Sequence, residues 1–514
     1  MSRRGTLLGA AASIAAVTVA ARVVGFGRTA VFTHAVGVNC LADTYTVANA
    51  VPNVVFEVVA GGALASLVVP VLAPAVAAGD RETASRTASA LLTWTLLVLV
   101  PVALLGLLLA PVLVRVLLSG SPPCGPAALE VGTGMLRVFL PQVVLYGVAV
   151  VLTGVLQAHR RFLGPALAPL LSSLVVAAAY VVYALRGRAE LAALPAGQEL
   201  VLSAGTTLGV AVLALSLLLP LRGTGLRLRP ALAFPPGVAP RVRGLALAGV
   251  AGLAAQQLAQ VVALRLSTRA TGGATVFTVS TALFLLPWAV LAVPVATSAF
   301  PRLSAAEGDE YARVARGALR AVLVLGLGGA AVLSAVALPV ARLLTPAPDA
   351  AQVGDLAQAV RAFAPGLAGY ALVALLGRAL YARGDGRSAG AATVAGWLAV
   401  AVADVVLVLG TDLRPATALG LGNAVGMTVA AGLLLLALGR RVPAALAGGG
   451  RTGGVAVLGA VAAALLVRLL PVPTGSSVTG SIALGAGLGA AALAAYVAVL
   501  AVGDRPGLRA LRRG

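Results

Sequence analysis

Long apolar segments follow one another along the whole chain, separated by short polar or arginine-rich loops. Each is at least twenty residues long, which at 1.5 Å per residue is enough to cross the hydrocarbon core of a bilayer. Every backbone amide in that core must be paired within the protein, so such segments fold as helices. With 60% of its 514 residues hydrophobic and only 10% charged, the chain is predicted to be an all-α, multi-pass membrane protein. We count fourteen spans, at residues 6–35, 41–73, 87–118, 131–157, 162–185, 199–221, 243–267, 273–300, 316–345, 354–382, 387–410, 415–439, 452–471 and 479–503.

Arginine supplies all 37 basic residues, and the loops that carry it predict the orientation of the chain. If the N-terminus is cytoplasmic, 24 arginines fall on the inner side and only four, Arg186, Arg188, Arg269 and Arg414, fall in outer loops. This bias follows the positive-inside rule and places both termini of a plasma-membrane protein in the cytoplasm. The net charge of +21 therefore reflects topology, and no nucleic-acid partner is expected. The first span is too long to be a cleaved signal peptide and contains no small-residue cleavage site.

The two cysteines, Cys40 and Cys124, both fall in predicted outer loops. That side of the membrane is oxidising, so a disulfide between them can form; the alternative is two unpaired small residues near the membrane interface. The two histidines, His34 and His159, lie near opposite membrane faces, so no metal site is predicted.

Residues 137–158 and 361–382 resemble each other at a constant offset of 224 positions. They share four informative residues in register: Arg137/Arg361, Phe139/Phe363, Pro141/Pro365 and Tyr146/Tyr370. The repeated segments are six spans apart, an even number, so the two halves are predicted to be parallel six-helix lobes with a substrate cavity between them. The predicted organisation is a first lobe at residues 1–221, a cytoplasmic linker at 222–242, a second lobe at 243–440, and two further helices with a basic cytoplasmic tail at 441–514.

The first span contains two arginines, Arg22 and Arg28. Arg22 lies roughly 27 Å along the helix axis from Arg4, too far to reach the cytoplasmic surface. An arginine at membrane depth costs about 2.5–3.5 kcal/mol and usually lines a cavity or a transport path; the alternative is that both side chains reach the outer interface. Guanidinium groups bind pyrophosphate oxygens bidentately, so a cavity lined by these arginines fits a lipid-linked anion. Three residues of the second span, Asp43, Asn53 and Glu57, are candidate partners for these charges.

No catalytic or nucleotide-binding motif competes with a transport function. The sequence lacks paired catalytic carboxylates and the phosphate-binding GxxxxGK[ST] loop. We therefore expect no enzymatic activity and no bound cofactor, with transport driven by the membrane potential or by a gradient of Na⁺ or H⁺. Asp404, in the eleventh span, is a candidate cation or gating residue with Thr417 and Asn423 as companions; the alternative is that it pairs with an arginine.

Residues 22–72 resemble the first two helices of the MviN/MurJ family of lipid II flippases, which belongs to the MOP exporter superfamily. The resemblance is carried by Arg22, the G-F-x-R motif at 25–28, the pair Pro52–Asn53 and the V-P-V-L stretch at 69–72. Residues 282–304 are similar to the eighth helix of the family, and Ala60–Gly62 to its actinobacterial branch.

The resemblance implies a flippase for lipid II, an undecaprenyl-pyrophosphate-linked precursor of peptidoglycan, with a role in cell-wall biogenesis and cell shape. It also implies that Arg22 and Arg28 line the substrate cavity. Some members of the family bind sodium through an aspartate on the helix that carries Asp404. Cell-wall synthesis or division proteins are candidate partners.

The chain departs from the family pattern at several positions. Phe56 and Ala282 stand where proteobacterial members carry further cavity arginines, Thr29 stands where an acid usually follows G-F-x-R, and Gly61 replaces a glutamate. Arg265, on the seventh span, is a candidate to replace a lost charge. Two alternatives therefore stay open: a MOP exporter of another polysaccharide–lipid intermediate or of drugs or cations, and a non-transporting scaffold for the cell-wall machinery.

Overall fold

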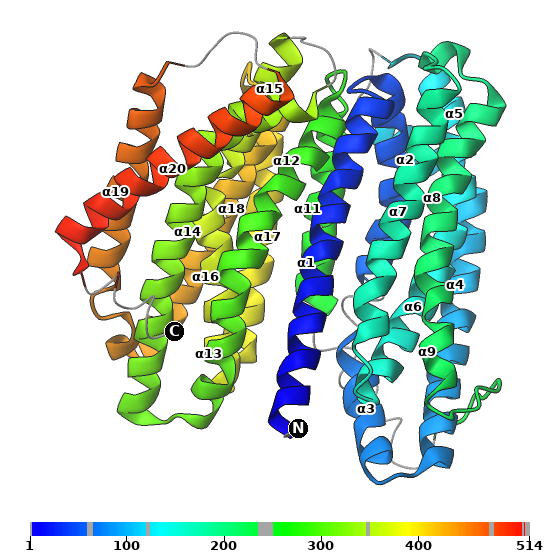
Figure 1. The fold of residues 1–514 in the computed structure, drawn as a ribbon, viewed down its shortest axis with the longest axis horizontal. Coiled ribbons are helices and arrows are strands. Elements are labelled where there is room, and N and C mark those ends of the chain that lie inside the picture. Colours follow the sequence, from blue (N-terminus) through cyan, green and yellow to red (C-terminus); the bar gives the residue numbers. More distant parts are fainter. Residues whose placement is uncertain are drawn as a thin grey trace. The chain divides into compact units, whose positions relative to one another are not determined.

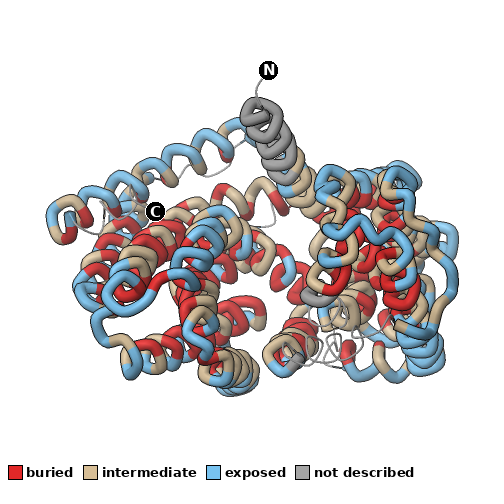
Figure 2. Tube along the Cα trace, turned by 90° about the horizontal axis from the view of Figure 1, so that it is seen from below, coloured by how far each residue is buried: buried red, intermediate tan, exposed pale blue. Residues whose placement is uncertain are grey.

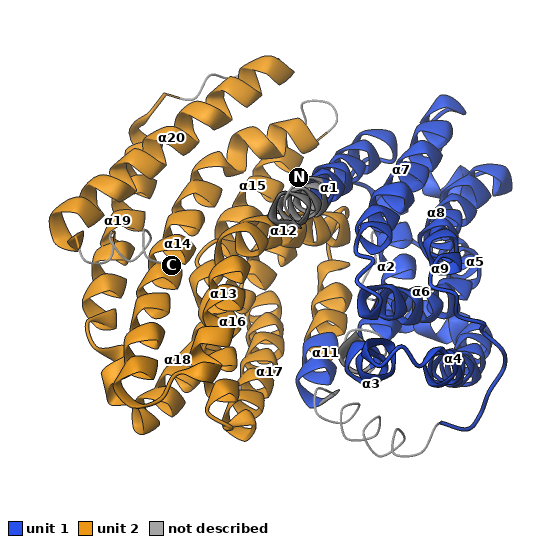
Figure 3. Cartoon of the chain, turned by 60° about the horizontal axis from the view of Figure 1, so that its bottom comes forward, with its two compact units in different colours: residues 1–257 blue, residues 258–514 orange. Residues whose placement is uncertain are grey.

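The computed structural model describes residues 3–58, 65–119, 124–234, 250–345, 350–471, 477–505 and 508. Every regular element in these ranges is a helix, which confirms the predicted all-α membrane fold (Figure 1). The chain divides into two compact units, Met1–Gln257 and Leu258–Gly514 (Figure 3). The motif at Ala60–Gly62, part of the predicted linker (235–242), the first residues of the seventh span (243–249) and the end of the basic tail (509–514) lie outside the described residues.

The first unit holds the helices that precede the arginine-rich linker. They are α1 (Arg3–Ala35), α2 (Cys40–Phe56), α3 (Ala65–Ala77), α4 (Arg81–Leu118), α5 (Ala127–Phe139), α6 (Pro141–Ala158), α7 (Leu163–Leu185), the short η3 (Leu191–Ala193), α8 (Ala196–Ser216) and α9 (Leu218–Arg222). The helix α11 (Val250–Ser267) contains the division between the two units.

The second unit contains the other helices of the described residues. They are α12 (Gly273–Pro287), the π-helical turn η4 (Trp288–Ala292), α13 (Val293–Ala305), α14 (Gly308–Leu344), α15 (Ala350–Phe363), α16 (Gly366–Ala382), α17 (Gly386–Gly410), α18 (Pro415–Arg441), η5 (Pro443–Leu446), α19 (Gly449–Leu469) and α20 (Val478–Gly503).

Eleven helical segments among the described residues are long and apolar enough to cross a membrane. The other three predicted spans, at 6–35, 41–73 and 243–267, contain α1, α2 with α3, and α11.

Several predicted spans are broken helices, and proline stands at each break. The span at 131–157 divides into α5 and α6 at Pro141, and the span at 354–382 divides into α15 and α16 at Pro365. Proline has no N–H to donate and fits the start of a new helix; Pro141 is the first residue of α6, and Pro365 directly precedes α16. Because Pro141 and Pro365 are equivalent in the internal repeat, the two units break at the same point. The span at 273–300 is interrupted by the π turn that follows Pro287.

Buried residues gather on the helix faces that meet other helices of the same unit (Figure 2). In α4, Leu91, Thr95 and Leu99 recur every four residues and are buried, whereas Leu97 and Leu108 on other faces are exposed. A helix that is apolar on its exposed side as well as its buried side is typical of a membrane span, where lipid tails cover the outer face.

A disulfide ties together one end of the first unit. Cys40, the first residue of α2, is bonded to Cys124, which precedes α5, and their Cα atoms lie 5.4 Å apart. The side chain of Asn39 caps the same helix end by accepting the backbone N–H of Ala42 at 3.0 Å. The start of α2 is therefore fixed to the connection between α4 and α5.

In the second unit, α17 and α18 approach closely because glycines face each other across their contact. A β carbon at Gly426 of α18 would stand 2.6 Å from the backbone nitrogen of Val400 and 2.7 Å from the carbonyl oxygen of Gly396, both in α17. Small residues at such contacts are a usual means of helix association in membranes, where backbones can then pack directly.

We predict that Gly426→Ala destabilises the purified protein. The added methyl group meets backbone atoms that cannot rotate away, so the two helices must separate, at a cost of about 1–3 kcal/mol. The matched control is Gly432→Ala on the same helix, where no atom lies within 4 Å of the added carbon and helix propensity favours alanine. Thermal unfolding in detergent should show a lower Tm for Gly426→Ala alone; equal Tm values for the two variants would contradict this packing.

For the disulfide, we predict that a membrane-impermeant maleimide labels neither Cys40 nor Cys124 in intact cells until a reductant is added. Both sulfur atoms are occupied by their mutual bond, and both residues are placed on the outer side by the arginine distribution. Labelling without reductant would remove the bridge. Labelling only after the cytoplasmic side is opened would instead overturn the predicted orientation.

Candidate functional site

The two arginines of the first span lie on α1, which continues unbroken past both. Being six residues apart, they point about 120° apart around the axis. Arg22 is exposed and Arg28 is half-buried. Between them, Gly25 and Gly27 have no atom within 4 Å of the position of a β carbon, so the helix has open space beside it here.

Arg28 lies among tyrosines of the first unit. Its charge is within electrostatic reach of the hydroxyl groups of Tyr45 of α2, Tyr146 of α6 and Tyr180 of α7. Phe32, one turn further along α1, packs with its ring centroid 5.1 Å from those of both Tyr45 and Tyr180. This aromatic contact fixes the face of α1 that packs against α2 and α7, one turn from Arg28.

The hydroxyl groups of Tyr45, Tyr180 and Thr206 form a buried network. The Tyr45 oxygen lies 2.8 Å from the Tyr180 oxygen and 2.6 Å from Thr206 Oγ1. The Thr206 hydroxyl also lies 2.8 Å from the Leu202 carbonyl oxygen, in its own helix α8. The network joins α2, α7 and α8, and because its members satisfy one another it is rigid.

A second polar group surrounds Tyr146. Its hydroxyl donates to Asn53 Oδ1 at 3.0 Å, and the Asn53 amide donates to the Asn49 carbonyl oxygen at 2.7 Å. The exposed side chain of Glu57, where α2 passes into a π turn, is within electrostatic reach of the Tyr146 hydroxyl. Phe56 stacks on the same tyrosine with ring centroids 4.5 Å apart. We call Arg28, Asn53, Glu57 and Tyr146 the Arg28 cluster.

Asp43 occupies a different position from the other acidic candidate of α2. It is buried in the first turn of that helix, where a carboxylate is favoured by the positive end of the helix dipole. Asn53 lies ten residues further on, about 15 Å along the axis. Asp43 therefore belongs to the helix end that holds the disulfide, and its position is accounted for by the start of α2.

Arg265 of α11 and Ala282 of α12 belong to the second unit, Arg265 being half-buried. The contacts within the first unit that build the Arg28 cluster do not include either residue. The proposal that Arg265 replaces a lost charge stays a prediction.

Asp404 is buried on the face of α17 that packs against α18. Its Oδ1 atom has no hydrogen-bond partner among the described residues. A β carbon at Gly422 of α18 would collide with this oxygen, so the carboxylate lies directly on the backbone of the neighbouring helix. A buried carboxylate oxygen without a donor favours either a proton or a bound cation at this position.

The two proposed companions of Asp404 are also buried polar atoms without partners in the described chain, at Thr417 Oγ1 and Asn423 Oδ1. The Asn423 oxygen lies toward Gly366 of α16, whereas Asp404 lies toward Gly422. Asp404 therefore lies against the backbone of α18, whereas the Asn423 side chain of α18 lies toward α16. No hydrogen bond between Asp404 and Asn423 occurs among the described residues. No group of three or more His, Cys, Asp or Glu side chains that could hold a metal ion occurs among the described residues.

Two features of the arginine distribution are not evident from the sequence. Arg378, on α16, is half-buried and donates to the carbonyl oxygen of Ala374 at 2.7 Å. Arg361 and Arg468 line a common cavity of about 320 Å³ with Ser334. The sequence gives a signal only for Arg361, which the internal repeat pairs with Arg137.

A family model described as lipid II flippase MurJ matches residues 32–484 of the chain. A lipid II flippase MurJ of Burkholderia cenocepacia is 27% identical over 388 residues, 73% of this chain and 73% of that protein. A probable lipid II flippase MurJ of Rhizobium meliloti is 26% identical and covers 65% of this chain and 62% of its own length.

Two solved structures have similar folds. A lipid II flippase MurJ in an inward closed conformation matches with a TM-score of 0.76 at 15% identity, covering 96% of this chain and 99% of that one. An inward-facing MATE multidrug resistance transporter of the MOP superfamily matches with a TM-score of 0.67 at 16% identity, covering 82% and 94%. At these identities the likeness describes the fold.

We predict that Na⁺ raises the Tm of the purified wild-type protein relative to a buffer of a bulky organic cation, and that Asp404→Asn abolishes this increase. A ligand that binds only the folded state stabilises it by RT ln(1 + [L]/Kd), and the variant keeps the side-chain volume while removing the charge. The matched control is Asp412→Asn, at an exposed loop position, which should keep the Na⁺ effect. If wild type and Asp404→Asn respond alike, the sodium role of Asp404 is wrong.

Proposed function

The chain belongs to the MurJ family of lipid II flippases, and we propose that it moves lipid II from the inner to the outer leaflet of the plasma membrane by alternating access. The family match extends over most of the chain and includes residues of both units. In the proposed orientation both termini are cytoplasmic and the arginine-rich loops face the inner leaflet, where lipid II is made.

The Arg28 cluster is the observation that carries this proposal. A half-buried guanidinium within electrostatic reach of tyrosine hydroxyls, one of which is bonded to the Asn53 amide, is suited to a pyrophosphate, which offers several oxygen acceptors at once. The open space beside Gly25 and Gly27 on the same helix leaves room for an approaching head group. Arg22, which is exposed and points in a different direction, would meet the substrate at another stage of its passage.

Phe56 changes how this site would hold its substrate. Its ring stacks on Tyr146, at a position where proteobacterial relatives are expected to carry an arginine. The pyrophosphate would therefore be held by fewer guanidinium groups, with Tyr146 and Asn53 supplying neutral hydrogen bonds. The cluster retains one acid, Glu57, within electrostatic reach of the Tyr146 hydroxyl.

We further propose that the membrane potential or an ion gradient drives transport. Outward movement of an anion is favoured by an inside-negative potential, by about 2.3 kcal/mol per charge per 100 mV. The buried carboxylate of Asp404 is the candidate site for a coupling Na⁺ or H⁺. Cell-wall synthesis or division proteins are the proposed protein partners.

We predict that Arg28→Ala abolishes growth when the variant is the only copy, while the protein still inserts and accumulates. Losing the charged hydrogen bonds of one guanidinium costs about 1.5–3 kcal/mol, so substrate affinity should fall roughly ten- to a hundredfold. Arg22→Ala should also fail to support growth. Arg28→Lys should rescue poorly, because an ammonium group cannot bind the phosphate oxygens bidentately.

The control for both variants is Arg115→Ala, an exposed arginine in the last turn of α4, which should support normal growth. Depletion of the protein should also cause lipid II to accumulate on the cytoplasmic leaflet. If Arg22→Ala and Arg28→Ala both support wild-type growth, the phosphate-binding role of these arginines is wrong. If depletion stops growth without trapping lipid II inside, the scaffold or exporter alternatives replace the flippase.

A further inference from the structure

An extended segment of the first unit, residues 225–232, lies along the N-terminal half of α4; we call it the strap. The backbone N–H groups of Arg227, Arg229 and Ala231 donate to three hydroxyl oxygens of α4, those of Ser85, Ser89 and Thr93, at 2.9, 3.0 and 3.1 Å. The spacing is matched, because four helical residues rise about 6 Å and two extended residues about 6.6 Å. The strap is thus held by its main chain along two turns of the helix.

Side chains of the strap alternate between the protein core and the outside. Leu226 and Leu228 pack against the core of the first unit, whereas Arg227 and Arg229 are exposed. Alternation of this kind follows directly from extended backbone, in which successive side chains point to opposite sides. The sequence LRLR therefore delivers two guanidinium groups to one face.

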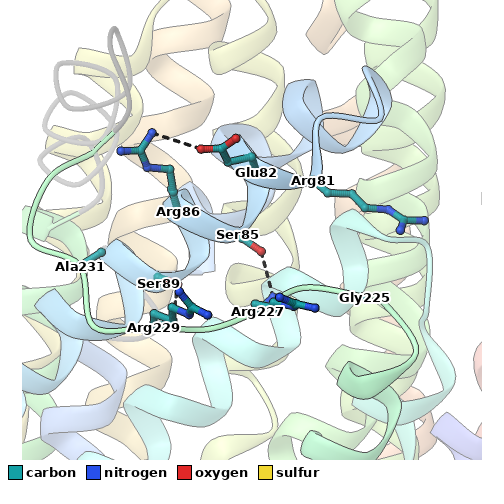
Figure 4. A pocket seen from close by; sticks show the side chains of 9 residues that line it. All are labelled: Arg81, Glu82, Ser85, Arg86, Ser89, Gly225, Arg227, Arg229 and Ala231. Carbon is teal, nitrogen blue, oxygen red and sulfur yellow. Dashed lines mark hydrogen bonds and ion pairs between the residues drawn. The ribbon is translucent and has the colours of Figure 1, made fainter.

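Arginines of the strap and of α4 line one pocket of about 490 Å³ (Figure 4). Its charged lining residues are Arg81, Arg86, Arg227, Arg229 and Glu82. Glu82 lies 3.6 Å from Arg86, both side chains being largely exposed, so this ion pair is weak. Four positive groups against one negative group leave the pocket strongly basic, which suits a phosphate-bearing ligand.

The surface of α4 next to the pocket is apolar and exposed. Leu97 stands eleven residues after Arg86, which is three helical turns, so the two share a face. Leu97 and Val98 are each 50% exposed, and Trp94, which precedes them on α4, is 46% exposed. The Trp94 indole donates to the carbonyl oxygen of Leu232 at 3.0 Å, a position typical of tryptophan at the boundary between head groups and lipid tails.

We propose that this pocket binds the phosphate head group of an anionic phospholipid, with its acyl chains lying along the exposed face of α4. Phosphate oxygens would meet Arg227 and Arg229 from the strap and Arg86 from α4, while Leu97 and Val98 contact the tail. A soluble phosphate compound would use the arginines but not the apolar surface that follows them. The pocket contains no residue of the Arg28 cluster, so it is separate from the proposed substrate site.

The test uses Trp94 as its reporter. The full-length protein contains three tryptophans, and Trp288→Phe/Trp397→Phe leaves Trp94 alone. This protein is placed in nanodiscs that contain, at equal mole fraction, phosphatidylglycerol or phosphatidylcholine with brominated acyl chains. Bromine quenches tryptophan fluorescence on contact, so stronger quenching by the phosphatidylglycerol measures selective occupancy beside the pocket.

We expect quenching by brominated phosphatidylglycerol to exceed that by phosphatidylcholine, and the preference to fall about 25-fold in Arg227→Gln/Arg229→Gln, since each basic residue near an anionic surface contributes about a fivefold factor. The strap should stay in place in this variant because its hydrogen bonds use main-chain N–H groups. The matched control is Arg313→Gln/Arg387→Gln, two exposed arginines of the second unit, which should keep the preference.

Equal quenching by the two lipids would overturn the proposal, as would an unchanged preference in Arg227→Gln/Arg229→Gln. If that variant does not fold, Arg81→Gln/Arg86→Gln removes the charges of α4 and must give the same loss. Equal quenching by the two lipids together with glycerol phosphate binding that is lost in Arg227→Gln/Arg229→Gln would show a soluble phosphate ligand in place of the lipid.

Discussion

The Arg28 guanidinium requires polar neighbours, because the lipid tails around a membrane-spanning helix offer none. The first unit supplies them from several helices. Tyr45 and Tyr180 are held by their mutual hydrogen bond and by Thr206, and Tyr146 is held by Asn53. The arginine is therefore within electrostatic reach of hydroxyl groups whose positions are already fixed. The relative placement of α1, α2, α6, α7 and α8 follows from this arrangement, and Phe32 secures α1 to it.

The two units share a backbone pattern but differ in the chemistry that it supports. Both break a span at the repeated proline and both place a tyrosine five residues later. In the first unit that tyrosine, Tyr146, bonds to Asn53 near a charged arginine. In the second unit, Tyr370 packs among rings, with centroids 4.9 Å from Trp288, 5.7 Å from Phe284 and 6.2 Å from Trp397. The repeat has thus kept its geometry while the side chains around the tyrosine diverged.

Hydropathy and proline positions predict most of the fold, because membrane helices have to satisfy their own backbone groups whatever their side chains are. The candidate site was less predictable. Arg28, Asn53 and Glu57 could be named from their occurrence in apolar spans. Tyr146, which interacts with all three, could not be predicted as a site residue, because its only distinguishing feature in the sequence is its repeat partner Tyr370. Tyr45 and Thr206 are 161 residues apart, and only the rotation of their helices brings them together. The orphan oxygen of Asp404 depends in the same way on a glycine of the next helix.

The strap is attached to α4 through its main chain, so its position does not depend on the side chains that it presents to the outside. Hydroxyls at Ser85, Ser89 and Thr93 accept N–H groups that nearly every amino acid possesses. Outward-facing residues of the strap can therefore be exchanged over evolutionary time without loosening it, proline at the bonded positions excepted. Related chains could in this way adapt one surface to membranes of different lipid composition while the helices beneath it stay unchanged.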